Sequence, residues 1–347
     1  MTFNPNEHQH LRYNPLKDEW VLVSPHRSLR PWSGQTETPP TEEVPRFDPT
    51  NPLCPGVTRA SGKVTPKYES TYVFENDFPA LLQEGPEPAE SDDPLFQTKT
   101  AKGTCRVICY HPYTDVYFYN LSTKEIVAVI DEWIKQAKEL GREYTWVQIF
   151  ENRGTMMGCS NPHPHCQIWA STFLPNEPRI KDINLRKFYD KYQKPMLQDY
   201  VEKELQKRER IVYENSEWVV VVPYWAVWPF ETMVLPKRQI QRFTDVDDRQ
   251  KEALAQVLQT VVVKYDNLFK CKFPYSMGWH GAPTGDKLEE CQPHWTFHGI
   301  YIPPLLRSAT VKKFMVGYEV LAQAQRDLTV EKAAAMLREQ PEKRFSL

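Results

Sequence analysis

Long hydrophobic runs are absent from this sequence of 347 residues, and no stretch of about 18 apolar residues occurs in it. We therefore predict no helix that crosses a membrane. Net charge is also small, a formal −2, which excludes the broad basic surface of a nucleic-acid-binding protein. Any phosphate that the protein binds must be met by local groups. We expect neither nucleic acid nor membrane among its partners.

Cysteine is scarce, with seven residues scattered from position 54 to position 291. An odd, scattered set argues against the disulfide framework of a secreted protein. The first five residues also lack a basic segment followed by an apolar core, so they do not resemble a secretion signal. We expect a cytoplasmic location.

The composition is otherwise that of a globular protein, 40% hydrophobic and 25% charged, and long enough for two ordinary domains or one large one. Thirty prolines and ten tryptophans are unusual. Because proline fixes φ and removes a hydrogen-bond donor, these positions interrupt strands and loops. The pattern indicates short strands and structured connections around a few helices.

One order of elements (strand, strand, helix, strand, strand) occurs twice along the chain. The first copy covers residues 71–74, 105–110, 122–140, 146–150 and 163–169, and the second covers 218–222, 232–236, 245–265, 274–279 and 294–302. Ser122 and Glu125 are spaced as a capping box at the start of the first helix. The order is common enough that coincidence is the alternative. If the repeat is real, it predicts an α+β fold of two similar domains, each an antiparallel sheet with packed helices.

The domain boundaries that follow are an N-terminal catalytic domain at 1–177, a charged, helix-compatible connector at 178–210 and a C-terminal domain at 211–347. The connector separates the two copies of the repeat.

The densest group of reactive side chains lies at residues 158–169, which read GCSNPHPHCQIW. Side chains alternate across an extended strand, so His163, His165 and Gln167 share one face, successive ones about 7 Å apart. The two prolines favour the extended conformation. Upstream, Gly158 and Ser160 could offer backbone N–H groups and a hydroxyl to phosphate oxygens.

Spacing alone leaves three interpretations of the two histidines open. Most such pairs are surface pairs, core pairs or parts of metal sites. Metal binding needs two more ligands, and none lies close in sequence. Nucleophilic catalysis needs a neutral imidazole near an electrophile, with the other ring nitrogen held by a partner.

The longer strings around this motif narrow the choice. The run NPHPHCQ at 161–167 resembles the active-site signature of the galactose-1-phosphate uridylyltransferase family, within the histidine-triad superfamily. Further matching strings are RYNPLKDEW at 12–20, FEN at 150–152, FPYSMGWHGAP at 273–283 and PPLLRSATVKKFMVGYE at 303–319. They follow in the right order and cover nearly the whole chain.

The resemblance implies two tandem histidine-triad-like domains and a homodimer whose active sites draw residues from both subunits. It implies a ping-pong exchange in which UDP-glucose and galactose 1-phosphate give glucose 1-phosphate and UDP-galactose. His165 would attack the α-phosphorus and carry the uridylyl group. Gln167 and Ser160 would stabilise charge on the α-phosphoryl oxygens. The chemistry itself would require no cofactor.

The resemblance also carries over substrate-binding residues by position. Those on the nucleotide side are Ala60, Asn76, Asp77, Asn152, Gly158, Cys159, Ser160 and Gln167. A sugar-side loop, expected to reach the partner's site, comprises Lys313, Phe314, Met315, Val316, Tyr318 and Glu319. Further phosphate or sugar contacts are Arg27, Arg30 and Gln325. For each residue, the alternative is an ordinary surface position.

Metal is where this sequence departs from the family. Many members bind a structural ion through a Glu and three histidines, and the matching positions here are Lys181, His280, His298 and Ile300. Some bacterial members bind zinc through two cysteines and two histidines, and here those positions are Asn51, Cys54, Thr114 and His163. Each remnant keeps two of four ligands, and a lysine ammonium would oppose a cation. We expect no tightly bound metal, with a structural zinc as the open alternative.

Overlaying residues 294–303 on the first His-x-His places His298 opposite His163 and Ile300 opposite His165. Since isoleucine cannot attack phosphorus, we expect the second domain to be non-catalytic. Two other functions remain open: another histidine-triad nucleotidyl transferase or hydrolase, such as a dinucleoside polyphosphate phosphorylase, and a non-catalytic dimeric binding protein. The first would share His165 without the sugar-side strings. The second is favoured by the degraded metal sites, whereas His165, Gln167 and Ser160 argue against it.

Overall fold

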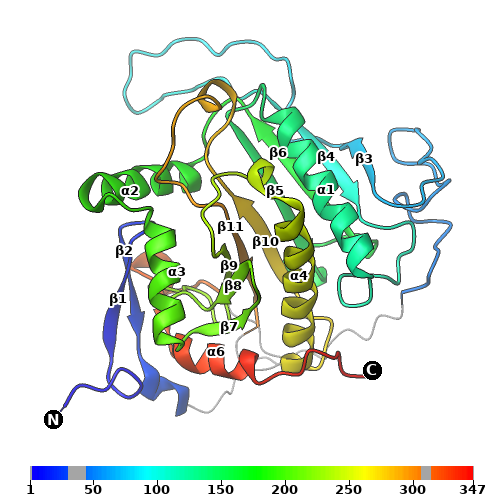
Figure 1. Cartoon of the computed structure of the whole chain (residues 1–347). Helices are drawn as coiled ribbons and strands as arrows, with labels where there is room; N and C mark the ends of the chain where they lie inside the picture. Colours follow the sequence, from blue (N-terminus) through cyan, green and yellow to red (C-terminus); the bar gives the residue numbers. More distant parts are fainter. Residues whose placement is uncertain (1, 30–43, 306–313, 347) are drawn as a thin grey trace.

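A computed structural model describes residues 2–29, 44–305 and 314–346 (Figure 1). Its strands are β1 (His10–Asn14), β2 (Glu19–Val23), β3 (Tyr72–Glu75), β4 (Gly103–Cys109), β5 (Trp146–Arg153), β6 (His165–Ser171), β7 (Ile211–Glu214), β8 (Trp218–Val221), β9 (Thr232–Pro236), β10 (Tyr275–His280), β11 (His298–Ile302) and β12 (Gln325–Arg326). Its α-helices are α1 (Thr123–Leu140), α2 (Asn176–Tyr192), α3 (Met196–Lys207), α4 (Asp248–Phe269), α5 (Tyr318–Leu321) and α6 (Val330–Arg338). None of the helices in the described residues is long and apolar enough to cross a bilayer.

The main sheet has nine strands in the order β3-β4-β6-β5-β10-β11-β9-β8-β7. Read outward from its centre, β5-β6-β4-β3 on one side corresponds to β10-β11-β9-β8 on the other. The two halves meet where β5 and β10 pair antiparallel, with Met277 opposite Glu151. The predicted α+β class with two like halves is therefore confirmed. The two expected sheets are joined at this seam into one.

Helices α1 and α4, one from each half, contact each other across one face of the sheet (Figure 1). Helix α1 begins after the predicted capping box, in which the Ser122 side chain accepts from the Glu125 N–H and the Glu125 carboxylate accepts from the Ser122 N–H. Its apolar stripe, with Ile126, Ile130 and Trp133 fully buried, packs on the sheet. This face forms the larger core.

Helix α4 begins later than predicted. The sequence placed its start at Asp245, but Asp245 ends a short 3₁₀ helix (Phe243–Asp245) and accepts from the N–H groups of Gln241 and Arg242. Asp247 is the N-cap instead, and its carboxylate accepts from the Gln250 N–H. Asp245 and Asp247 are both suitable N-cap residues. Asp245 forms its bonds within the 3₁₀ turn, and Asp247 caps the helix.

The opposite face of the sheet is covered in one half only. Over the second half, α2 and α3 bury a smaller core that includes Val219, Val221 and Met233 of the strands with Leu185 and Leu197 of the helices. Over the first half, no such layer lies on the strands among the described residues, and Trp169 of β6 is 38% exposed. Within the described residues, this face of the first half is thus partly exposed, unlike the matching face of the second half.

A second, three-stranded sheet has the order β1-β2-β12, with β12 parallel to β2. Arg12 of β1, itself buried, bonds Glu331 of α6 through two hydrogen bonds of 2.8 and 3.0 Å. This pair fixes the start of the chain to the helix near its end.

Candidate active site

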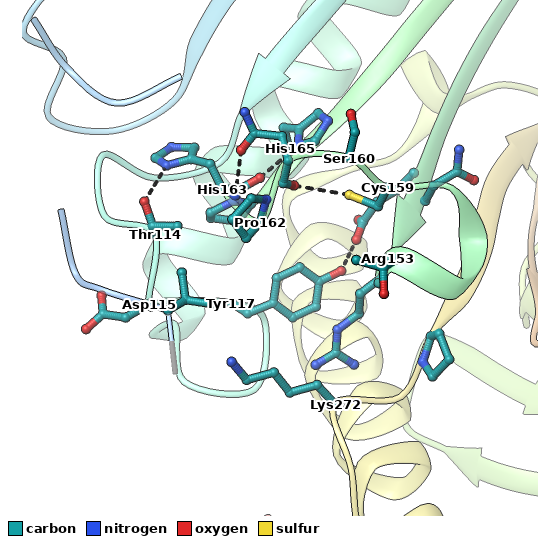
Figure 2. A pocket seen from close by; sticks show the side chains of 18 of the residues that line it. Thr114, Asp115, Tyr117, Arg153, Cys159, Ser160, Pro162, His163, His165 and Lys272 are labelled. Carbon is teal, nitrogen blue, oxygen red and sulfur yellow. Dashed lines mark hydrogen bonds between the residues drawn. The ribbon is translucent and has the colours of Figure 1, made fainter. Parts of the chain in front are cut away.

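A cavity of about 360 Å³ lies where β5 ends and β6 begins. It is lined by the loop between these strands, which carries Ser160 and His163, by His165, and by segments near Tyr117 and Lys272. Figure 2 shows these side chains gathered around it. The motif that the sequence analysis singled out therefore opens on a real cavity.

His165 is the first residue of β6, and its ring is held by one backbone contact. Its Nδ1 lies 2.7 Å from the carbonyl oxygen of His163. Because a carbonyl only accepts, Nδ1 must carry the ring proton and Nε2 keeps its lone pair. Burial lowers the pKa of His165 below its ordinary value, although the bond to the carbonyl raises it. At neutral pH this is an unprotonated imidazole with a nucleophilic nitrogen.

His163 is buried, and both of its ring nitrogens are engaged. Nε2 lies 2.9 Å from the Tyr68 hydroxyl, which itself donates to the Leu53 carbonyl, so Nε2 is the donor in this pair. Nδ1 then accepts from the Thr114 hydroxyl at 2.9 Å. Burial lowers the pKa of His163 to about 4. His163 is therefore a fixed, neutral residue that lines the cavity, and its carbonyl positions the His165 ring.

The loop before the histidines has a turn that depends on glycine. A short 3₁₀ helix (Thr155–Met157) ends at Gly158, whose φ of 74° lies in the left-handed region. Ser160 follows on the surface at the cavity, and the Cys159 thiol donates to the Asn161 carbonyl at 3.1 Å. The predicted phosphate-side residues thus lie together beside His165. Gln167, two residues after His165 on the same face, has its amide oxygen turned to the Trp169 indole at 3.3 Å.

Asn152 lies on β5, and Asp77 lies in the segment that follows β3. The Asn152 amide oxygen accepts from the Ser276 hydroxyl at 2.6 Å across the β5–β10 seam. Asn76 and Asp77 follow β3, where the Asn76 side chain caps the turn by accepting from the Phe78 N–H. Ala60 is exposed in the neighbouring turn.

Sequence reasoning missed Arg59, which lies beside Asp77. Its guanidinium is 3.5 Å from the Asp77 carboxylate and 4.0 Å from the centre of the Phe74 ring. The side chain is 5% exposed, and its Nε and Nη1 atoms have no hydrogen-bond partner. A buried cation with unused donors at this position is available to orient Asp77 or a ligand. The adjacent Ala60 was the only signal in the sequence.

A buried carboxylate was also missed. Glu151 alternates with Asn152 on β5 and so faces the helix side, where the hydroxyls of Tyr110 and Tyr117 donate to it. Burial raises the pKa of Glu151 to about 7. Arg153, two residues on, forms a buried ion pair of 2.8 Å with Asp266 of α4. Both residues reach the cavity lining. The alternation of the strand was the available signal.

The predicted sugar-side residues do not line the cavity that contains His165. Phe314, Val316 and Tyr318 are all more than half exposed, and Met315 and Glu319 lie with them around Arg326, which pairs with Glu319 at 2.7 Å. Gln325 is in β12, and exposed Arg27 pairs with Asp327 beside it at 3.3 Å. Arg30 and Lys313 lie outside the described residues. The described residues of this set therefore lie outside the lining of the cavity that contains His165.

The first set of metal-matching positions is occupied by a buried lysine between two histidines. Lys181 of α2 is 4% exposed, and its Nζ lies 2.9 Å from His280 Nδ1 and 3.2 Å from His298 Nε2. Burial lowers the pKa of Lys181 to about 8, against the opposing charges of Glu177 and Glu231. Burial also lowers the pKa of His280 and of His298 well below the ordinary value. An ammonium fills the space between the two ligands, so these residues do not fit a metal.

The second set of metal-matching positions also lacks a complete set of metal ligands. Cys54, Thr114 and His163 lie together, with the Cys54 thiol 3.7 Å from His163 Nδ1 and 3.3 Å from the Thr114 hydroxyl. Asn51 instead exchanges two hydrogen bonds with Asn161, at 2.8 and 2.9 Å. No group of three or more His, Cys, Asp or Glu side chains able to hold an ion occurs in the part of the chain that the structure describes.

An imidazole with an unprotonated nitrogen, next to a glycine-containing loop, is an arrangement suited to nucleotidyl transfer through a covalent intermediate. Residues 1–175 match the family described as galactose-1-phosphate uridyl transferase, N-terminal domain, and residues 181–346 match its C-terminal domain. The chain belongs to the galactose-1-phosphate uridylyltransferase family.

Relatives of known name cover almost the whole chain. Identity is 60% over 340 residues with a probable galactose-1-phosphate uridylyltransferase of Drosophila melanogaster, covering 98% of this chain and 97% of the relative. It is 55% over 346 residues with the Rattus norvegicus galactose-1-phosphate uridylyltransferase, covering 100% and 91%.

Two solved structures share the fold. A uridylyltransferase has a TM-score of 0.75 at 24% identity, covering 95% of this chain and 97% of that one. An ADP-glucose phosphorylase of Arabidopsis thaliana has a TM-score of 0.74 at 21% identity, covering 96% and 100%. Because chains with different names share it, the fold alone does not fix the substrates.

Proposed function

We propose that this protein transfers a uridylyl group between UDP-glucose and galactose 1-phosphate, giving glucose 1-phosphate and UDP-galactose. The observation that carries the proposal is the hydrogen bond from His165 Nδ1 to the His163 carbonyl, which leaves Nε2 as the nucleophile. Membership of the family supplies the substrates.

The reaction proceeds in two displacements at phosphorus. The Nε2 lone pair attacks the α-phosphorus of UDP-glucose, a P–N bond forms, and the bond to the bridging oxygen breaks. Glucose 1-phosphate leaves with that electron pair. A phosphate oxygen of galactose 1-phosphate then attacks the same phosphorus, and Nε2 recovers its lone pair. No proton needs to move, because both leaving and attacking groups are phosphate oxygens.

The intermediate places positive charge on the His165 ring, since Nδ1 keeps its proton when Nε2 binds phosphorus. The His163 carbonyl, 2.7 Å from Nδ1, stabilises that charge. His163 can hold the carbonyl there because its own ring is fixed at both nitrogens by Thr114 and Tyr68. This chemistry requires no cofactor.

We assign the stabilisation of charge on the α-phosphoryl oxygens to Gln167 and Ser160. The backbone N–H groups near Gly158 and Cys159 lie in the same loop as Ser160. Both side chains lie within one short segment around the nucleophile. The uridine and ribose are assigned to the open face, where Asn152, Asn76 and Asp77 supply polar groups and Ala60 lies at the edge.

The sugar-side contacts are assigned to a partner subunit. Within one chain, Phe314, Val316 and Tyr318 lie away from the cavity with their side chains largely exposed. Exposed apolar side chains in one short segment suit a surface that a second copy covers. A homodimer would let each subunit complete the other's site.

The cytoplasmic location stays part of this proposal, and subcellular fractionation is its test.

The experiment is intact-mass measurement after mixing the protein with UDP-glucose. We expect a gain of one uridylyl group per chain, and its loss when galactose 1-phosphate is added. His165→Asn and His165→Gly proteins should fold and gain nothing. An adduct on His165→Asn would overturn the mechanism. An adduct that inorganic phosphate discharges and galactose 1-phosphate does not would indicate a phosphorylase, and no adduct at all would favour a binding protein.

A further inference from the structure

Lys181 replaces a metal ion in this protein, we infer, by joining helix α2 to strands β10 and β11 through its ammonium group. The inference concerns the second half of the sheet and is independent of the proposed reaction. It starts from three side chains that meet in the interior, Lys181, His280 and His298, each supplied by a different element.

The hydrogen bonds of this cluster are mutually consistent. His298 Nδ1 lies 2.9 Å from the Thr296 carbonyl, so Nδ1 carries the proton and Nε2 is an acceptor. That Nε2 faces Lys181 Nζ at 3.2 Å. His280 presents Nδ1 to the same ammonium at 2.9 Å, so its proton is on Nε2. An ammonium has three donors and no acceptor, which makes two neutral imidazoles suitable partners.

The two imidazoles are held together by the sheet. His280 and His298 are opposite each other in the β10–β11 pair, and their ring centres are 5.6 Å apart. Their lone pairs converge on the position that Nζ occupies. A zinc ion bound to both nitrogens at about 2.0–2.1 Å would need that position. The lysine therefore excludes the ion by occupancy and by charge.

Helix α2 gains a second attachment from the adjacent residue. The Asp182 carboxylate accepts from His294 Nε2 at 2.8 Å and from the Trp295 indole at 2.7 Å. Lys181 and Asp182 thus bind both the strand pair and the segment just before β11. Since α2 covers the second half of the sheet, a cation at Lys181 performs the joining role that a bound ion would otherwise have.

Ile300 supplies a way to test the replacement. It follows His298 by two residues on β11, so its side chain leaves the same face of the sheet. Exchanging Lys181→Glu together with Ile300→His would present a carboxylate and three imidazoles, a complete shell for zinc. Either exchange alone leaves the shell incomplete or leaves the ammonium in place.

The first experiment measures metal content and melting temperature of the full-length protein in zinc or chelator. We expect the unmodified protein to bind well under one equivalent and its Tm to ignore both additions. The double variant should bind one zinc per chain and acquire a Tm that chelator lowers. The inference is overturned by stoichiometric zinc in the unmodified protein that His280→Ala abolishes, or by a double variant that takes up none.

The second experiment tests the ammonium itself. Lys181→Met should lower the Tm by about 3–6 °C, because two buried acceptors lose their donor. Lys187→Met, at an exposed position on the same helix, is the control and should leave the Tm unchanged. An unchanged Tm in Lys181→Met would count against the joining role.

If the variants fold poorly, ¹⁵N-histidine NMR of the unmodified protein remains decisive. It should show the Nε2–H tautomer for His280 and the Nδ1–H tautomer for His298. The reverse tautomer at either residue would overturn the arrangement.

Discussion

Reactivity at the residue scale comes from one backbone contact. The carbonyl that accepts from His165 Nδ1 belongs to His163, only two residues earlier, and His163 is fixed by its own ring contacts. The proposed nucleophile is therefore oriented by its near neighbour, and Thr114 and Tyr68 hold that neighbour in place. A short proline-containing segment can then set the tautomer of its own catalytic group.

Gln167 should act on the transition state. Its amide oxygen accepts from the Trp169 indole, which leaves the amide N–H groups available as donors to a phosphoryl oxygen. Replacing Gln167 with Ala should lower kcat by roughly 10²–10³-fold, as for loss of one oxyanion donor. Steady-state kinetics of both half-reactions would measure this, with Gln83→Ala at an exposed position as the control. A change confined to KM would assign Gln167 to ground-state binding.

Glu151 should make stability depend on pH. Burial raises its pKa from 4.5 to about 7 despite the hydrogen bonds from Tyr117 and Tyr110 and the nearby charge of Arg153. The folded state thus binds a proton that the unfolded chain releases above about pH 4.5. The contribution of protonated Glu151 to the free energy of unfolding is full below about pH 4.5 and is lost as the pH rises through about 7.

The measurement is denaturant unfolding of the unmodified protein and of Glu151→Gln from pH 5 to pH 8. The free energy of unfolding of the unmodified protein should fall relative to the variant from pH 5 to about pH 7 and then stay level up to pH 8. A constant difference would show that Glu151 does not titrate there.

Sequence pattern predicted some of these residues and missed others for physical reasons. That His165 and Gln167 share one face was predictable, because side chains alternate along a strand and both residues lie in β6. Lys181 was expected to repel a cation, and its bonding to two imidazoles could not be predicted because it depends on which lone pairs face it. Arg59 is defined by burial against Phe74, a contact that spacing does not encode.

The helices and strands of both halves were largely predictable from the sequence. The pairing that joins the two halves into one nine-stranded sheet was not. The repeat located β3, β4, α1, β5 and β6 and their counterparts in the second half. The β5–β10 seam was missed because pairing between distant strands depends on which edges remain uncovered. Asymmetry in the covering also escaped prediction, since only the packed fold shows that α2 and α3 lie on one half.

At the element scale, the contact between β11 and the larger core should tolerate no added atom at Gly299. A Cβ there would lie 2.6 Å from the Trp279 ring, which is stacked on Phe243 and Phe297 at centroid distances of 5.2 Å each. Gly299→Ala should therefore lower the free energy of unfolding by about 1–3 kcal/mol, because the clash outweighs the stabilisation that Ala gives by lowering the conformational entropy of the unfolded chain. Thermal unfolding would measure it.

The control for this substitution is Gly85→Ala, where a Cβ would meet nothing within 4 Å. Equal stabilities of the two variants would mean that the tryptophan stack can shift, and the core on this face would then be looser than the packing indicates.

At the scale of the whole molecule, two surfaces are incompletely covered: the exposed face of the first half of the sheet, and the exposed sugar-side segment. The proposed nucleophile lies beside a surface that the described residues of its own chain leave partly exposed, and Phe314, Val316 and Tyr318 are exposed outside the cavity lining. A symmetric dimer would satisfy both at once, with each surface used twice.

Mixed dimers test this arrangement directly. If His165 and Tyr318 of one site come from different subunits, His165→Asn and Tyr318→Ala homodimers should both be impaired. A dimer of one chain of each kind, purified through two different tags, should hold one intact site and recover about half of the unmodified activity. Placing both substitutions on one chain, opposite an unmodified chain, should instead leave no intact site. Recovery in that second pairing and none in the first would place both residues in the same subunit's site.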